Sequence, residues 1–377
     1  MFSHLKVLEL ANVLAGPSVG QFFAELGAEV IKIENALTGG DVTRSWKSAG
    51  EKTDDRSAYF CSVNWGKKSV AVDLTKDDGK SLVQKLAAQS DIIIASYKPG
   101  DAEKLGVSYE QLITNDKQLI YGQITGYGSD NERVGYDAVL QAESGFMDLN
   151  GEKTGPPTKM PVALIDVLAG HQLKEGLLLA LLNRELTGKG DLVEVSLIET
   201  AISSLVNQAS NWLVAGKQPT RQGSAHPNIA PYGESFGTAD GKLILLAIGS
   251  DRQFFDLCDI LEIHRKSISE KFSTNQQRVE GRRELAEILS SKFKLRNSGD
   301  LLEKIHHKKI PAGLIQTVKE ALAAPEIESI LLSGNSLQGI RNFIGHFPLN
   351  PSINSSALSP PPHFGEHTEE ILARISK

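Results

Sequence analysis

Near its start the chain reads Val7-Leu-Glu-Leu-Ala11, then Ala15-Gly-Pro-Ser-Val-Gly20, then Ala28-Glu-Val-Ile-Lys-Ile-Glu34. The first and third runs are short and contain several Val, Leu or Ile side chains, which is typical of strands. The stretch between them predicts a helix over roughly 18–26 that Gly27 ends. A strand, a helix and a second strand in close succession require the two strands to run parallel.

The same alternation continues along the first half of the chain. Strands are predicted at 69–74, 91–95 and 119–124, with a helix at about 77–89 between the first two, and long helices at 166–185 and 196–215. Strands that alternate with helices favour a doubly wound α/β sheet. We therefore expect a large Rossmann-like α/β domain over residues 1–200.

The composition changes near residue 217. Residues 217–232 are rich in Gly, Pro, Ser and Asn, which indicates a loop, and we assign 201–224 as a linker. A strand at 242–248 and helices near 251–261, 276–293 and 299–307 then predict a smaller α/β domain over 225–325. The last part, 326–377, is a linker with a Pro- and Ser-rich tail, followed by an amphipathic helix at 367–376.

Bulk composition excludes several classes of protein. The chain has 377 residues, of which 40% are apolar, and a net charge of −6 without a basic block, so nucleic acid is not an expected partner. It contains no run of about 18 apolar residues and no signal-peptide pattern, so we expect no membrane association and a cytoplasmic location. Two distant cysteines, Cys61 and Cys258, give neither a disulfide framework nor metal-ligand spacing, and no metal is expected.

The first strand–helix–strand unit raises the possibility of a dinucleotide site. Gly16 and Gly20 lie at the turn into the helix, and Glu34 ends the second strand, where an acid can bind ribose. The spacing is not G-x-G-x-x-G, however, and Pro17 removes one N–H that could bind pyrophosphate. A tightly packed strand–helix turn is the better interpretation.

Asp166 follows the apolar run Val162-Ala-Leu-Ile165 and lies at the start of a long predicted helix. A carboxylate in that position has two explanations. It can cap the helix by accepting orphan backbone N–H groups. Alternatively, it can be a nucleophile that is kept out of water. The local sequence alone leaves both readings open.

Ten segments, taken in order, resemble the class III CoA-transferase family, which includes formyl-CoA transferase, carnitine CoA-transferases and α-methylacyl-CoA racemase. The segments span nearly the whole chain. They are Val13-Leu-Ala-Gly-Pro17 with Leu26-Gly-Ala-Glu-Val-Ile-Lys-Ile-Glu34, Gly40-Asp-Val-Thr-Arg44, Asn64-Trp-Gly-Lys-Lys-Ser69, Ser96-Tyr-Lys-Pro-Gly100, Ile124-Thr-Gly-Tyr-Gly128, Gly135-Tyr-Asp137 with Gln141-Ala-Glu-Ser-Gly145, Thr187-Gly-Lys-Gly190, His226-Pro-Asn-Ile-Ala-Pro-Tyr232, Ile310-Pro-Ala-Gly313 and Gly365-Glu-His-Thr368.

The resemblance implies a fold and an assembly. The C-terminal part is expected to return to the large domain, and two copies of the chain are expected to form an interlocked homodimer. The linkers near 195–230 and 325–345 would allow the two chains to pass through each other.

The resemblance also implies an activity. CoA moves from an acyl-CoA thioester to a free carboxylic acid, and Asp166 is the nucleophile that forms aspartyl anhydride and aspartyl-CoA intermediates. Coenzyme A is then a substrate, and no permanently bound cofactor is expected. Racemases of the same family use a histidine in a Gly-His-Asp segment. Here Tyr136 takes that position, and a phenol with a pKa near 10 is a poor base at neutral pH, so acyl-CoA racemisation is the alternative.

The CoA-binding residues carried over from the family lie in the first 130 residues. They are Val13, Ala15, Asn35, Val72, Thr75, Ser96, Tyr97, Lys98, Lys104, Leu105 and Tyr127. Taken alone, Lys98 and Lys104 are ordinary surface lysines, and Arg44 is either a phosphate ligand or a surface charge. The chain departs from formyl-CoA transferase at Asn35, Leu14 and Thr125, where that enzyme has arginine, glutamine and lysine. Leu14 therefore predicts an acyl group with more carbon and less charge than oxalyl.

Overall fold

The computed structural model describes residues 1–113, 118–345, 347–349 and 357–375. Contacts within the chain divide it into two compact units. The first unit contains residues 1–146, 159–217 and 328–377, and the second contains 147–158 and 218–327. Residues 147–158 group with the second unit, whereas the sequence predicts them in the large domain.

A six-stranded parallel sheet forms the centre of the first unit, in the order β3-β2-β1-β4-β5-β6. The strands are β1 (Lys6–Glu9), β2 (Glu29–Asn35), β3 (Lys67–Val72), β4 (Ile92–Ala95), β5 (Ile120–Thr125) and β6 (Leu192–Ser196). The chain runs outward in opposite directions from the β1–β4 pair. In sheets of this kind, ligands bind outside the carboxyl ends of the strands at this reversal.

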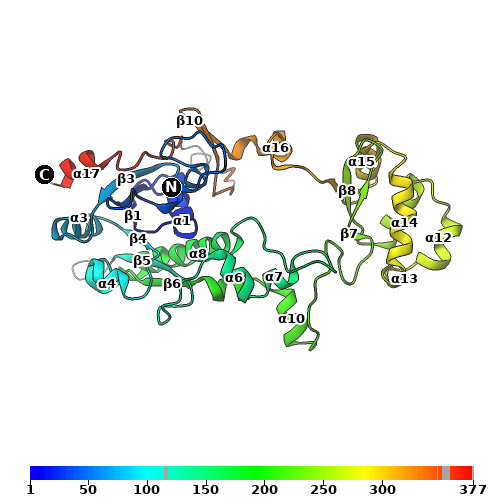
Figure 1. The fold of residues 1–377 in the computed structure, drawn as a ribbon, viewed down its shortest axis with the longest axis horizontal. Coiled ribbons are helices and arrows are strands. Elements are labelled where there is room, and N and C mark those ends of the chain that lie inside the picture. The colour runs from blue at the N-terminus through cyan, green and yellow to red at the C-terminus, as the bar shows by residue number, and fades with distance from the viewer. Residues whose placement is uncertain (114–117, 346, 350–356, 376–377) are drawn as a thin grey trace. The chain divides into compact units, whose positions relative to one another are not determined.

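Helices cover both faces of this sheet (Figure 1). On one face, α1 (Ala15–Glu25) and α8 (Leu164–Thr187) pack on apolar side chains such as Val7. On the other face, α3 (Asp77–Ala87), α4 (Asp101–Leu105) and α17 (Thr368–Ile375) pack on side chains such as Leu8. Successive residues of a strand point to opposite faces, so strands covered on both sides read as continuous apolar runs.

Helix α1 packs too closely against β1 and the residues after it to allow side chains at two of its own positions. A Cβ on Gly16 would lie 2.3 Å from the Cβ of Ala11, and one on Gly20 would lie 1.8 Å from Oε2 of Glu9. These glycines therefore allow helix–strand contact, which supports the tightly packed turn over a dinucleotide fingerprint.

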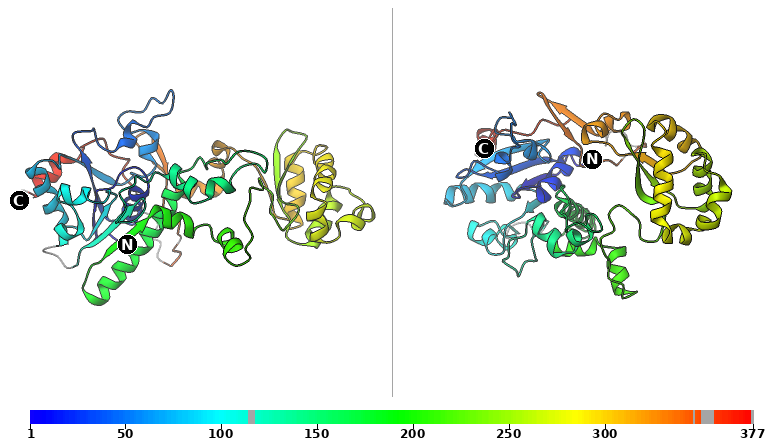
Figure 2. Two further views of the ribbon diagram at one scale, coloured as in Figure 1. Left: turned by 60° about the horizontal axis from the view of Figure 1, so that its bottom comes forward. Right: turned by 45° about the vertical axis from the view of Figure 1, so that its right-hand side comes forward.

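The C-terminal part of the chain lies against the first unit. Helix α17 contacts β3 and α3 and buries Ile371 completely in the core there; Figure 2 shows this helix in red. Upstream of it, the carbonyl oxygen of Pro361 accepts from Arg56 at 3.1 Å and that of Pro362 accepts from Arg44 at 3.2 Å. The expected return to the large domain is present.

The second unit has its own core. Its antiparallel sheet contains β7 (Tyr232–Gly237), β8 (Leu243–Ala247) and β9 (Ala312–Leu314), and helices α11 (Asp251–Ile260), α14 (Arg282–Phe293) and α15 (Ser298–His307) pack on it.

The remaining elements of the two units are η1 (Val42–Ser45), α2 (Ala58–Cys61), α5 (Tyr109–Leu112), α6 (Asp137–Glu143), α7 (Phe146–Leu149), α9 (Leu197–Ser203), α10 (Asn207–Leu213), α12 (Arg265–Phe272), α13 (Asn275–Glu280), α16 (Val318–Ala321), η3 (Pro325–Ile330), β10 (Leu331–Gly334) and β11 (Leu337–Ile340).

Two predicted helices are interrupted in the structure. The helix expected over 276–293 is divided at Gly281 into α13 and α14, and the one expected over 196–215 is divided into α9 and α10. Among the described residues, no helix is both long and apolar enough to span a membrane.

Candidate active site

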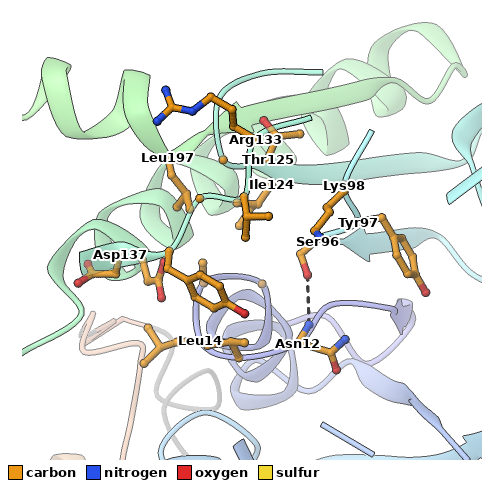
Figure 3. A pocket seen from close by; sticks show the side chains of 18 of the residues that line it. Asn12, Leu14, Ser96, Tyr97, Lys98, Ile124, Thr125, Arg133, Asp137 and Leu197 are labelled. Carbon is orange, nitrogen blue, oxygen red and sulfur yellow. Dashed lines mark hydrogen bonds between the residues drawn. The ribbon is translucent and has the colours of Figure 1, made fainter. Parts of the chain in front are cut away.

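A cavity of about 210 Å³ opens at the carboxyl ends of β1, β4 and β5, where the strand order reverses. Its walls come from the loop that follows β1 (residues 12–16), the loop that follows β4 (96–99), the end of β5 (124–126) and residues 133–137, together with Asp166 and Leu197. Figure 3 shows several of these side chains around the cavity. The site therefore lies where the sheet topology predicts it.

Asp166 is the third residue of α8, and its side chain is only 8% exposed. The N-cap residue of α8 is Ala163, which makes no side-chain capping bond. Asp137, at the start of α6, instead accepts the backbone N–H of Ile165 at 2.8 Å. The capping interpretation of Asp166 is therefore wrong, because another acid caps this helix from outside it.

The electrostatic environment of Asp166 is unusual for a carboxylate. Burial, together with the neighbouring Asp137, raises the pKa of Asp166 to about 7. Within the described residues, no hydrogen bond offsets this cost. The phenol of Tyr59 lies close enough for its pKa to rise to about 12, through burial and through the charges of Asp166 and Asp137. Perturbed acids in a cavity are candidates for chemistry.

The part of the cavity wall formed by the loops after β1 and β4 suits a negatively charged ligand. The hydroxyl of Ser96 accepts the backbone N–H of Asn12 at 3.2 Å and so joins the two loops, as the dashed line in Figure 3 shows. Lys98 is exposed and lines the cavity beside Tyr97. The first turn of α1 also lines the cavity, and a helix N-terminus attracts anions.

Five of the eleven predicted CoA-binding residues line this cavity, namely Val13, Ala15, Ser96, Tyr97 and Lys98. The other six lie outside its lining: Asn35, Val72, Thr75, Lys104, Leu105 and Tyr127. Asn35 and Val72 are partners in the register of β2 and β3, at the carboxyl ends of those strands. These six stay predictions for the part of a ligand that extends beyond the cavity.

Three of the six already bind neighbouring side chains. The Thr75 hydroxyl donates to Asp73 at 2.6 Å, the Lys104 ammonium pairs with Asp101 at 3.3 Å, and the Tyr127 hydroxyl donates to Glu143 at 2.9 Å. All of these contacts are exposed to solvent, so a ligand could replace them at little cost.

Both interpretations of Arg44 are wrong. Arg44 is 6% exposed and forms a buried ion pair with Glu34, with 2.6 Å between Nη2 and Oε1. Glu34 also accepts from the Ser69 hydroxyl at 2.6 Å. Neither Arg44 nor Glu34 is therefore available to a phosphate or a ribose.

Sequence reasoning gave no role to several residues of the cavity wall: Asn12, Pro99, Arg133, Val134 and Leu197. No local pattern identifies them, since the first four lie in loops and Leu197 begins α9, and only the tertiary fold brings these segments together. For Asp137 the sequence offers only its place in the family-like segment Gly135-Tyr-Asp137, without a role.

In the described part of the chain, one group of side chains has the spacing of metal ligands. Asp54, Asp55 and His363 have ligand atoms within 4.8 Å of one another. Asp54 already pairs with Arg56, and Asp55 pairs with both His363 and Arg44. We therefore assign no metal to this exposed cluster.

Comparisons with known proteins identify related sequences and folds. The family model for CoA-transferase family III matches residues 2–368. The succinate–glutarate CoA-transferase of Agrobacterium fabrum is 36% identical to the chain, over 99% of the chain and 95% of that protein. The human succinyl-CoA:glutarate CoA-transferase is 34% identical, over 98% of the chain and 85% of that protein. A crystal structure of a CaiB/BaiF family protein from Brucella suis superimposes with a TM-score of 0.88 at 37% identity, covering 98% of both chains.

Proposed function

Because this chain belongs to CoA-transferase family III, we propose that it transfers CoA between carboxylic acids by covalent catalysis at Asp166. One observation supports this assignment above the others. Asp166 is a buried acid whose pKa is raised to about 7, and it lines the cavity at the reversal point of the sheet. A carboxylate with a raised pKa is a better nucleophile than an ordinary aspartate and is still substantially ionised near neutral pH.

The proposed reaction balances without any further reagent. The Asp166 carboxylate attacks the thioester carbonyl of the donor, and CoA leaves as a thiolate from a mixed anhydride. The thiolate attacks the aspartyl carbonyl and releases the donor acid, which leaves an aspartyl-CoA thioester. The acceptor carboxylate attacks that thioester, and the thiolate then attacks the acceptor's own carbonyl in the second anhydride. Acyl-CoA and the free Asp166 carboxylate are the products.

The surroundings of Asp166 suit these intermediates. Anhydrides hydrolyse readily, so the reaction requires a site that excludes water, and Asp166 is almost entirely buried. Asp166 lies in the first turn of α8, where the positive end of the helix dipole favours the negative charge that develops on the aspartyl carbonyl. CoA is consumed and regenerated as a substrate.

Short dicarboxylic acids are the proposed substrates. Two relatives at 34–36% identity are named for succinate and glutarate. Leu14, half-buried in the cavity wall, adds apolar surface there, which suits the methylene groups of such acids better than oxalate. A panel of acyl-CoA donors and free acids would identify the pair, and faster turnover with oxalate would contradict this assignment.

The decisive experiment concerns the covalent step. Incubation with acyl-CoA followed by peptide mass spectrometry should find an adduct on Asp166, and Asp166→Ala should abolish transfer while CoA still binds. His171→Ala is the matched control, since His171 is an exposed residue of the same helix, five positions further on. Deuterium entering the α-carbon of acyl-CoA without any acceptor acid would indicate racemisation instead and would overturn the proposal.

A homodimer is the proposed assembly. Helix α8 carries a row of exposed leucines in the single chain, Leu179, Leu182 and Leu186, which are 67%, 58% and 79% exposed. Positions three or four apart lie on one side of a helix, so these side chains form a continuous apolar stripe. A contiguous apolar surface of this kind is typical of protein–protein contact.

A further inference from the structure

The loop that follows β1, residues 12–16, supplies one wall of the cavity and has a strained backbone. Val13 lies in this loop with φ at +73°, in the left-handed region. That conformation is a real outlier for a β-branched residue, because Cβ crowds the backbone. Such strain persists only where surrounding contacts enforce it, and it concentrates at functional sites.

The contacts that enforce this conformation come from a buried ionic cluster beneath the loop, made of Glu9, Lys32, Asp41 and Lys67. All four side chains are fully shielded from solvent. The Lys32 ammonium lies 2.9 Å from Glu9 and 3.0 Å from Asp41, and the Lys67 ammonium lies 2.7 Å from Glu9. The two acids and two lysines balance in charge.

This cluster holds the loop at three points. Lys32 donates to the carbonyl oxygen of Ala11 at 2.7 Å, and Lys67 donates to that of Pro17 at 2.8 Å. Between these two points, the Asp41 carboxylate accepts the backbone N–H of Val13, at 3.3 Å and 3.2 Å from its two oxygens. The cluster therefore binds the backbone of the loop, residues 12–16, just before it, just after it and at the strained Val13.

Asp41 is itself firmly held. It also accepts from the backbone N–H of Thr43 at 3.0 Å and from the Thr43 hydroxyl at 2.8 Å. Burial opposes ionisation of Asp41, but Lys32 and the bonds from Thr43 more than compensate, and the pKa of Asp41 is lowered. The carboxylate therefore stays charged, and charge-assisted hydrogen bonds are about twice as strong as neutral ones.

We propose that Asp41 is a positioning residue, which together with Lys32 holds Val13 in its left-handed conformation and thereby fixes the loop that lines the same cavity as Asp166. Asp41 does not line the cavity. Its effect on turnover is transmitted through the Val13 N–H, and loosening the loop misplaces the bound thioester. A measurement of turnover rests on the proposed function, whereas a measurement of the loop's conformation is independent of it.

The first test measures backbone amide exchange in residues 11–17 by mass spectrometry, which needs no substrate. Asp41→Asn removes the charge and should speed exchange in this peptide by at least ten-fold. Asp91→Asn is the matched control. Like Asp41, the Asp91 carboxylate accepts a backbone N–H, from Lys6 at 2.8 Å, and pairs with a cation, Arg184, at 3.1 Å. Asp91 lies just before β4, at the amino ends of the strands and away from the cavity. Equal exchange in the two variants would overturn the proposal.

The second test is rescue. Glycine adopts positive φ without strain, so Val13→Gly should reduce the dependence of the loop on Asp41. Asp41→Asn should lower kcat/KM by roughly ten- to a hundred-fold in the natural background, as expected for a misplaced reactive group, and much less in the Val13→Gly background. Equal losses in the two backgrounds would mean that Asp41 acts only on overall stability, and the proposal would fail.

A milder variant covers the case in which Asp41→Asn does not fold. Thr43→Val keeps the size of the side chain and the charge of Asp41 but removes the 2.8 Å bond from the hydroxyl. It should produce a smaller increase in exchange over residues 11–17, and no increase would count against the proposal. Absence of transferase activity in the natural protein, with the exchange result as expected, would refute only the proposed function.

Discussion

Asp137 accepts the backbone N–H of Ile165 at 2.8 Å, one residue before Asp166. The same carboxylate also accepts from the side-chain amide of Gln141 at 2.7 Å. Asp137 thus satisfies an orphan donor of α8 and at the same time brings a second acid to the site. The first role stabilises the helix, and the second disfavours the ionised form of Asp166.

The pH dependence of activity should report this pair of acids. In the proposed mechanism only ionised Asp166 attacks, so kcat/KM should fall as the pH decreases through about 7, where its raised pKa lies. Asp137→Asn removes the neighbouring charge and leaves burial, so the fall should move to lower pH. Asparagine still offers an oxygen to the Ile165 N–H. An unchanged profile in this variant would mean that Asp137 does not tune Asp166.

The raised pKa of Asp166 should also make the stability of the protein depend on pH. Because folding raises the pKa of Asp166 from 3.8 to about 7, the folded state binds more protons between those values, and stability falls as the pH rises across that interval. Asp166→Asn has no such penalty. Its advantage over the natural protein should grow by about 2–3 kcal/mol between pH 5 and pH 8. Thermal melts of the two proteins at both pH values measure this, and a constant difference would contradict the raised pKa.

Substrate preference should change at Leu14, which lines the cavity. Leu14→Gln replaces apolar surface by an amide that can donate to a second carboxylate, so the ratio of turnover with oxalate to turnover with glutarate should increase. Leu14→Met, which keeps an apolar side chain of similar size, is the control and should leave the ratio nearly unchanged. A similar loss with both acids would indicate general damage to the site.

The apolar stripe on α8 should control assembly. Leu182→Glu puts a charge into the proposed contact and should increase the fraction of monomer in light scattering coupled to gel filtration. Leu295→Glu, at a leucine of the second unit that is 73% exposed, is the control and should not change the mass. A natural protein that is already monomeric would refute the dimer.

The sequence predicted the parts of the fold that local pattern encodes. Strand β4 is buried on both faces and is a wholly apolar run, and β1 and β2 combine buried Val, Leu and Ile with the buried charges Glu9, Lys32 and Glu34. Strand β6 was not predicted, because most of its residues are only partly buried and Glu194 interrupts the pattern. Hairpin β10–β11 was missed for the same reason, since only Leu332 of its eight residues is buried.

The candidate site was predicted less completely. The family resemblance predicts Asp166 as the nucleophile, and this stays a prediction. Local reasoning could not distinguish a nucleophile from a cap, because the residue that does cap α8 is Asp137, 28 positions before Ile165. Lys32 and Lys67 are 0% and 1% exposed. Lysines are rarely buried, and only the fold shows which acids neutralise them.

Helix α17 and the segment before it bear on how the protein is made. The backbone N–H of His367 donates to the carbonyl oxygen of Ser69 at 2.9 Å, and Arg374 pairs with Glu29 at 2.6 Å. Strands near the N-terminus therefore depend on contacts from residues that are synthesised some 300 positions later. A ribosome would release the second unit before the residues that complete the core around β3 and α3 have been made. Stop codons in the final forty positions should therefore yield aggregates rather than a shortened enzyme.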